Sequence, residues 1–159
     1  MPTHVYQPTR NPPTWRDRVL VHPLDATVAT VAVAFGVIVL AALVWPEFVP
    51  SKSMDRMTWP VVALIGSFLG AGGGVALTGL FWRGANVSTG WALERLGWLL
   101  AAGGFITYAI SVAWHYPGSA FSWAIPLALG LGAVLRVVSI VAIERGVRRV
   151  LADVKEGGA

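Results

Sequence analysis

Four stretches of the chain are apolar over the ~20 residues that an α-helix needs to cross the hydrocarbon core of a bilayer. Residues 26–45 and 60–82 contain no charged side chain, and residues 92–114 carry charge only near their start. Inside residues 122–143 the only charged side chain is Arg136, and Glu144 closes that stretch. None of the four alternates between apolar and polar residues as a strand would, and open sheet edges cannot face lipid. The sequence therefore predicts an all-α integral membrane protein, a four-helix bundle with spans at about 26–45, 60–82, 92–114 and 122–144.

The spans divide the chain into three regions. Residues 1–25 form a Pro-rich tail with a short interfacial helix from Thr14, residues 26–145 form the four-span domain, and residues 146–159 form a basic amphipathic stub. With 55% hydrophobic and 13% charged residues, the chain has no room for a separate soluble domain. The first apolar stretch has full membrane length, so we expect it to stay in the bilayer rather than to be cleaved as a signal peptide.

Positive charge lies mainly on one side of the predicted membrane. Nine basic residues fall on the side that holds both termini and the second connection, and two fall on the other side. Cytoplasmic loops carry the excess of Lys and Arg in membrane proteins. We therefore expect both termini in the cytoplasm. The nine are Arg10, Arg16, Arg18, Arg83, Arg95, Arg145, Arg148, Arg149 and Lys155, and the two are Lys52 and Arg56.

Tryptophan marks the same span ends. An indole ring prefers the headgroup boundary, where its apolar body and its N–H both find suitable surroundings. Six of the eight tryptophans lie where this topology needs them, four at outer ends and two at inner ends. The predicted interfacial anchors are Trp45, Trp59, Trp114 and Trp123 outside, and Trp82 and Trp91 inside.

Small residues recur every four positions on two of the spans. They are Gly66, Gly70 and Gly74 on the second span, and Ala124, Ala128 and Gly132 on the fourth. Such spacing makes a flat helix face that another backbone can approach closely. The same physics serves tight packing within one bundle and self-association between copies, so both interpretations stay open. We expect a homo-oligomer.

Glu94 and Arg136 are the most informative polar residues. Ionisable side chains inside a span are costly and are usually paired or face water. At ~1.5 Å per residue, Glu94 lies about one turn inside the third span and Arg136 about two turns inside the fourth. A snorkelling Arg136 reaches the level of Glu94. We expect a Glu94–Arg136 pair, with Arg95 left to reach the headgroups. The pair either fixes the helix register or lines a pore or proton path.

The sequence carries no signature of an enzyme or of a bound cofactor. The histidines His4, His22 and His115 are widely separated, and there is no cysteine. No two carboxylates are predicted to share a span, and the glycine-rich run 70–74 lies inside an apolar helix rather than after a strand. We therefore predict no enzyme activity, no metal and no cofactor. The expected partners are the bilayer and its anionic headgroups, through Arg145, Arg148 and Arg149, and not nucleic acid.

Part of the chain resembles a known group of proteins. The segments GWALERLG (90–97), GAVLRV (132–137) and IER (143–145) are similar to segments of small four-span membrane proteins of actinobacterial phages, which are described as holin-like. The resemblance covers roughly residues 90–149. It implies a protein that accumulates in the inner membrane, self-associates and permeabilises it during host cell lysis.

Two other functions remain open from the residues. The chain is either a non-conducting accessory or regulatory membrane protein that binds a membrane partner, or a small channel or transporter that uses Glu94 and Arg136. The first alternative requires the tails for its effect, and the second requires the two charged side chains.

Overall fold

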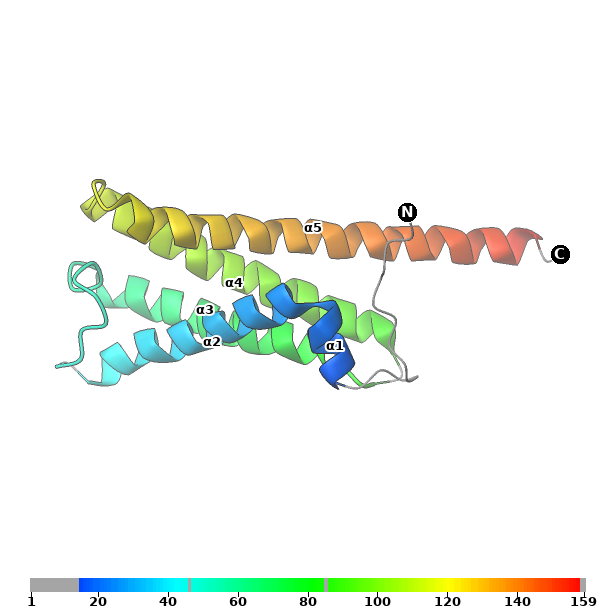
Figure 1. Cartoon of the computed structure of the whole chain (residues 1–159), viewed down its shortest axis with the longest axis horizontal. Helices are drawn as coiled ribbons and strands as arrows, with labels where there is room; N and C mark the ends of the chain where they lie inside the picture. Colours follow the sequence, from blue (N-terminus) through cyan, green and yellow to red (C-terminus); the bar gives the residue numbers. More distant parts are fainter. Residues whose placement is uncertain (1–14, 46, 85, 158–159) are drawn as a thin grey trace.

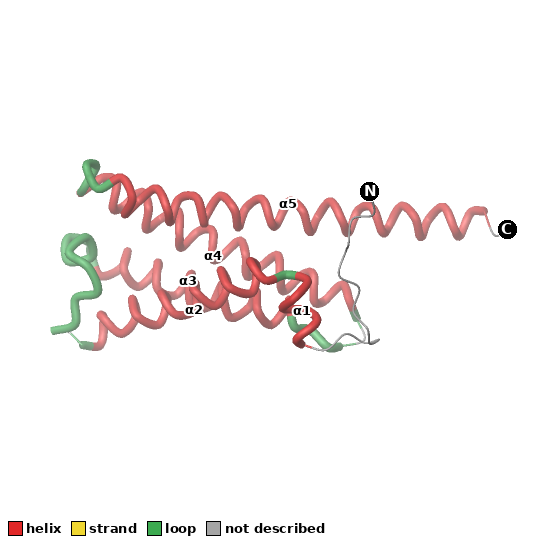
Figure 2. The backbone as a smooth tube through the Cα atoms, in the orientation of Figure 1, coloured by secondary structure: helices red, strands yellow, loops and turns green. Residues whose placement is uncertain are grey.

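The computed structural model describes residues 15–45, 47–84 and 86–157. These residues form five helices: α1 (Trp15–Val21), α2 (Pro23–Val44), α3 (Trp59–Leu80), α4 (Val87–His115) and α5 (Ala120–Gly157), shown in Figure 1. In Figure 2 the described chain consists only of helices and the loops that connect them. The predicted all-α class is confirmed for this part of the chain. Most of the predicted Pro-rich tail, residues 1–14, lies outside the described residues.

Four of the helices are long and apolar enough to cross a membrane. They are Pro23–Val44, Trp59–Leu80, Val87–His115 and the Ala120–Val147 part of α5. Their number and their order along the chain agree with the four predicted spans. The chain is therefore described from here on as a multi-pass membrane protein.

Helix starts follow from local chemistry. Proline occupies the first turn of α2 and of α3, where a backbone N–H has no partner within the helix and its loss costs nothing. At the start of α4, the Asn86 side chain accepts a hydrogen bond from the Ser88 backbone N–H at 3.1 Å. That bond satisfies one of the free N–H groups of the first turn.

Successive helices are neighbours, and glycine sets how closely they approach. A Cβ on Gly36 of α2 would overlap the backbone of Gly70 on α3, and one on Gly97 of α4 would overlap Ala76 on α3. Between α4 and α5, a Cβ on Gly130 would lie 2.7 Å from the side chain of Ile106. The backbones therefore meet at distances that only glycine permits.

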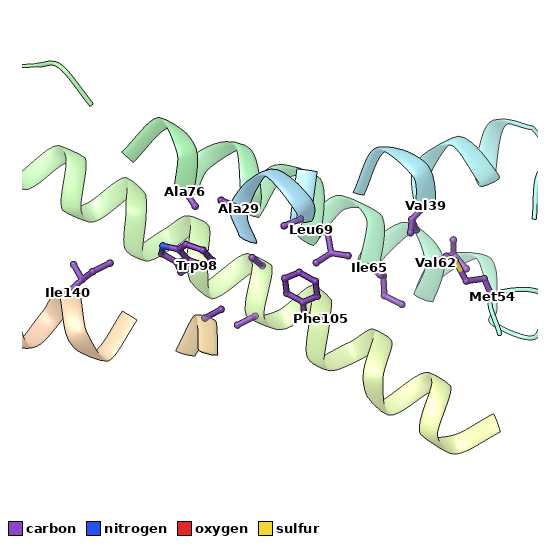
Figure 3. Close-up of a cluster of buried hydrophobic side chains, with 14 residues drawn as sticks. Ala29, Val39, Met54, Val62, Ile65, Leu69, Ala76, Trp98, Phe105 and Ile140 are labelled. Atoms are coloured by element: carbon purple, nitrogen blue, oxygen red, sulfur yellow. The ribbon is translucent and has the colours of Figure 1, made fainter. Parts of the chain in front are cut away.

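The hydrophobic core lies mainly between α3 and α4. Figure 3 shows Ile65, Leu69 and Ala76 of α3 beside Trp98 and Phe105 of α4, all buried. The outer helices α2 and α5 bury a smaller share of their residues than α3 and α4 do. Because lipid replaces water around such helices, exposed apolar side chains on α2 and α5 are expected in a bilayer.

The chain connections define two ends of the molecule. At one, here called the hairpin end, α2 connects to α3 and α4 connects to α5. There the Tyr116 hydroxyl donates to the Lys52 backbone carbonyl at 3.2 Å, and the Arg56 guanidinium lies 5.7 Å from the centroid of the Tyr116 ring. These contacts tie the two connections together. The other end, here called the terminal end, holds α1 and the connection from α3 to α4 (Figure 1).

The last helix is much longer than a membrane span. Its 38 residues extend about 57 Å at 1.5 Å per residue, against ~30 Å of hydrocarbon. Figure 1 shows α5 projecting far beyond the other helices at the terminal end. The backbone of the predicted stub is therefore helical as far as Gly157.

Candidate functional site

Glu94 and Arg136 meet between α4 and α5. The Nε and Nη2 groups of Arg136 both donate to Oε1 of Glu94, at 3.1 and 2.8 Å. Glu94 is only 6% exposed. A guanidinium that donates twice to a buried carboxylate gives a stronger and more directional contact than a single hydrogen bond. The structure thus brings together the two span residues that the sequence singles out.

Asp25 joins this pair from α2, and the sequence analysis missed it. The Nη2 atom of Arg136 lies 3.1 Å from Oδ2 of Asp25. Asp25 directly precedes the first uncharged stretch, so it was assigned to the N-terminal tail. In the structure it lies in the first turn of α2, where the helix dipole also stabilises a negative carboxylate. The sequence signal that could have identified Asp25 was its position directly before an apolar stretch.

His22 lies next to Asp25 at the break between α1 and α2. Its Nδ1 atom is 3.5 Å from Oδ2 of Asp25. The side chain is more than a third exposed, so it reaches the surface of the molecule at the terminal end. His22 therefore connects the buried ion pairs with the surface.

Arg95 does not extend alone toward the headgroups, and that expectation is wrong. Its Nη1 atom donates to Oε2 of Glu144 on α5 at 2.8 Å. Glu144 is buried, and a carboxylate at that depth needs a cationic partner. Because α4 and α5 lie side by side, Arg95 reaches Glu144.

The five charged residues of these contacts are called here the charged cluster. Asp25, Glu94 and Glu144 supply three carboxylates, and Arg95 and Arg136 supply two guanidinium groups. Arg136 pairs with both Asp25 and Glu94, and Arg95 pairs with Glu144. Because an ionisable side chain inside a span is costly without a partner, these contacts hold the charges of α2, α4 and α5 together.

A small cavity borders the charged cluster. It measures about 180 Å³, and its walls include Asp25, Arg136 and Trp98. Trp98 is 3% exposed, and its indole N–H has no hydrogen-bond partner among the described residues. In Figure 3 the indole nitrogen lies on the side of the ring that faces the terminal end. A cavity of this size with polar groups in its wall can hold ordered water.

The small-residue positions fall into two sets. Gly66 and Gly70 face α2, where their neighbours are Leu40 and Gly36. A Cβ on Gly74 or on Gly132 would meet nothing within 4 Å, and Ala128 is exposed, whereas Ala124 is half-buried. The glycine face of α3 is thus partly used inside the chain, and the Ala128–Gly132 face of α5 is open.

The tryptophans differ between the two ends. Trp45, Trp59 and Trp114 are exposed at the hairpin end, and the half-buried Trp123 donates to the Pro117 carbonyl at 3.3 Å. Nearer the terminal end, Trp82 donates to the Asn86 carbonyl at 3.0 Å and Trp91 packs against the core. The exposed rings are therefore concentrated at one end.

The expected headgroup contacts lie on the projecting part of α5. Arg145 and Arg149 are exposed. The side chain of Arg148 lies outside the described residues.

Comparison of the chain with protein-family models, with curated proteins and with solved structures found no match.

Proposed function

We propose that this chain is a holin-like membrane protein that self-associates and permeabilises the bacterial inner membrane during phage-type lysis. The observation that carries the proposal is the open small-residue face of α5. Ala128 is exposed, and a side chain at Gly132 would meet nothing within 4 Å. In a bilayer, such faces allow helices of separate copies to pack closely.

Self-association supplies what a single copy lacks. Among the described residues the core between α3 and α4 is apolar and closely packed, so it offers no continuous polar route between these two helices. Arg136 lies one turn along α5 from Gly132, and the intervening Ala133 is buried. Assembly through the open face would therefore place charged clusters of several copies near a shared axis.

The orientation is part of the same proposal. Both termini lie in the cytoplasm by the excess of basic residues on that side. There the exposed Arg145 and Arg149 bind anionic headgroups where α5 leaves the membrane.

Membrane potential in cells induced to express the chain is the direct test. A voltage-sensitive dye should report a sudden collapse after a delay. Gly132→Leu should delay or abolish the collapse, because a Cβ there meets nothing within 4 Å in the chain and the larger side chain fills the open face beside the small cavity. The matched control is Gly74→Leu, which also has open space but lies on α3. Unchanged potential at confirmed membrane levels of the unmodified chain would refute the proposal and favour the accessory role.

The charged cluster favours a second candidate, a small channel or transporter. Asp25, Glu94 and Arg136 join three helices beside a small cavity that Asp25 and Arg136 help to line, and His22 links them to the surface. Ionisable residues in this arrangement often mark ion or proton pathways. Glu94→Gln and Arg136→Gln would then abolish flux across vesicles while leaving insertion intact. Normal flux in both variants would leave the cluster a structural role only.

A further inference from the structure

An apolar groove opens between α2 and α5 in the half of the molecule nearer the hairpin end. It encloses about 490 Å³, and its walls come from α2, the 48–54 segment, Leu69 of α3, α4 and α5. Figure 1 shows α2 and α5 at opposite edges of the row of helices. Ile38, Phe105, Ile125 and Leu129 are among the side chains that line the groove. Its walls are almost entirely hydrocarbon, so the groove suits an apolar occupant.

The groove is as deep as one leaflet of a bilayer. At the hairpin end it begins at Ser51, and its innermost wall residue on α5 is Leu129. Leu129 is the tenth residue of α5, which places it about 14 Å along the helix at 1.5 Å per residue. That depth is about half of a ~30 Å hydrocarbon core. The groove therefore runs from the interface to about the middle of the membrane.

Three residues of the wall carry a hydroxyl group, Ser51, Tyr108 and Ser122, and Ser51 belongs to the segment at the interfacial end. The Ser51 hydroxyl is buried and has no hydrogen-bond partner among the described residues. A buried hydroxyl without a partner is unfavourable, because it has lost its bonds to water. If the Ser51 side chain rotates toward the groove, an occupant with an acceptor oxygen at its interfacial end and hydrocarbon below it satisfies both parts of the groove.

The groove is too small to enclose a helix of a second copy. A spanning helix about 30 Å long and 10 Å wide displaces on the order of 2,400 Å³, several times the volume of the groove. A single extended hydrocarbon chain is narrow enough to enter between the side chains.

We infer that this groove binds one acyl chain of a bilayer phospholipid. The lipid comes from the leaflet at the hairpin end, and an ester oxygen accepts a hydrogen bond from the Ser51 hydroxyl. The bound chain fills the space that α2 and α5 leave between them, so the lipid acts as part of the packed structure. This inference is independent of whether the protein conducts.

Retention of lipid by the purified full-length protein tests this inference. The chain is reconstituted in vesicles of phosphatidylglycerol and phosphatidylethanolamine, extracted in mild detergent, washed, and weighed by native mass spectrometry. The unmodified chain should keep about one phospholipid per copy. Ile38→Trp should lose it, because Ile38 lines the groove and is 40% exposed, leaving room for the larger ring to fill it.

The matched control is Val37→Trp on the neighbouring position. Val37 is 60% exposed and is not part of the groove wall, so this variant should keep the lipid. Ser51→Ala should release the lipid at a several-fold lower detergent concentration. Circular dichroism of each variant checks that the helices are intact.

Three results would overturn the inference. They are a lipid-free unmodified chain, equal retention by Ile38→Trp with intact helices, and a retained mass that matches a free fatty acid or a second copy instead of a phospholipid. Loss of lipid in the control Val37→Trp alone would place the lipid on the outer face of α2 and would also contradict it.

Discussion

The carboxylates of Asp25 and Glu94 share one nitrogen atom, Nη2 of Arg136, at 3.1 and 2.8 Å. The two acidic residues are 69 positions apart in sequence and stand on α2 and α4, and the arginine is on α5. This one guanidinium therefore links the first and last spanning helices, which otherwise face each other across the groove. Without this guanidinium, α2 and α5 would lose both the charge and the bulk that connect them.

Arg136→Gln should destabilise the protein more than any other single charge substitution. It leaves the buried Glu94 and the partly buried Asp25 without this cation; losing the partner of a buried carboxylate costs about 3–5 kcal/mol, and Asp25 adds less because solvent reaches it. Thermal unfolding in detergent measures the change. Arg83→Gln is the control, because Arg83 is exposed on the connection from α3 to α4. Equal melting temperatures for the two variants would show that the ion pairs contribute little.

Arg95 and Glu144 should be energetically coupled. Their contact at 2.8 Å joins α4 to α5 independently of Arg136. In a double-mutant cycle with Arg95→Gln and Glu144→Gln, a coupling energy of about 1 kcal/mol is expected, since Arg95 is partly exposed and solvent weakens the pair. Unfolding of the two single variants and the double variant gives that value. A coupling energy near zero would mean that this contact contributes nothing to stability.

Gly36→Ala should weaken the contact between α2 and α3. A methyl group at Gly36 would overlap the backbone of Gly70, and overpacking of this kind costs about 1–3 kcal/mol. The same substitution at the partner glycine, Gly70→Ala, is the control, because a Cβ on Gly70 would lie 3.8 Å from Gly36, an ordinary contact. A fall in melting temperature for Gly36→Ala but not for Gly70→Ala is expected. The opposite order would mean that the two helices pack in another register.

The membrane orientation is testable by single-cysteine labelling, since the chain has no cysteine of its own. Gly118→Cys lies at the hairpin end and Ser88→Cys at the terminal end, and both positions are exposed. A membrane-impermeant maleimide should label Gly118→Cys in intact spheroplasts and should label Ser88→Cys only after lysis. Labelling of Ser88→Cys in intact spheroplasts would place the termini outside the cell.

The helices were predictable because their signal is local. A run such as 60–82 has no charge, and the length that lipid demands fixes its extent to within a few residues. The Glu94–Arg136 pairing followed from two depths, counted along two helices that had to be close. Asp25 was not found, because a charge at the border of an apolar run fits a tail as well as a first helical turn.

The partners of the small residues depended on tertiary structure. The spacing of Gly66, Gly70 and Gly74 predicts a flat face, but it does not tell which helix covers it. In the structure Gly66 and Gly70 meet α2, whereas Gly74 stays open. The Arg95–Glu144 contact has the same origin, since it depends on how far α4 and α5 slide along each other.

The unbroken length of α5 has a mechanical consequence. From Arg136 to Gly157 the helix continues for about 32 Å without a turn or loop. A rigid rod transmits torque, whereas a flexible tail would absorb it. Any force on the projecting part of α5 therefore acts with a long lever arm on the contacts of Arg136 with Glu94 and Asp25.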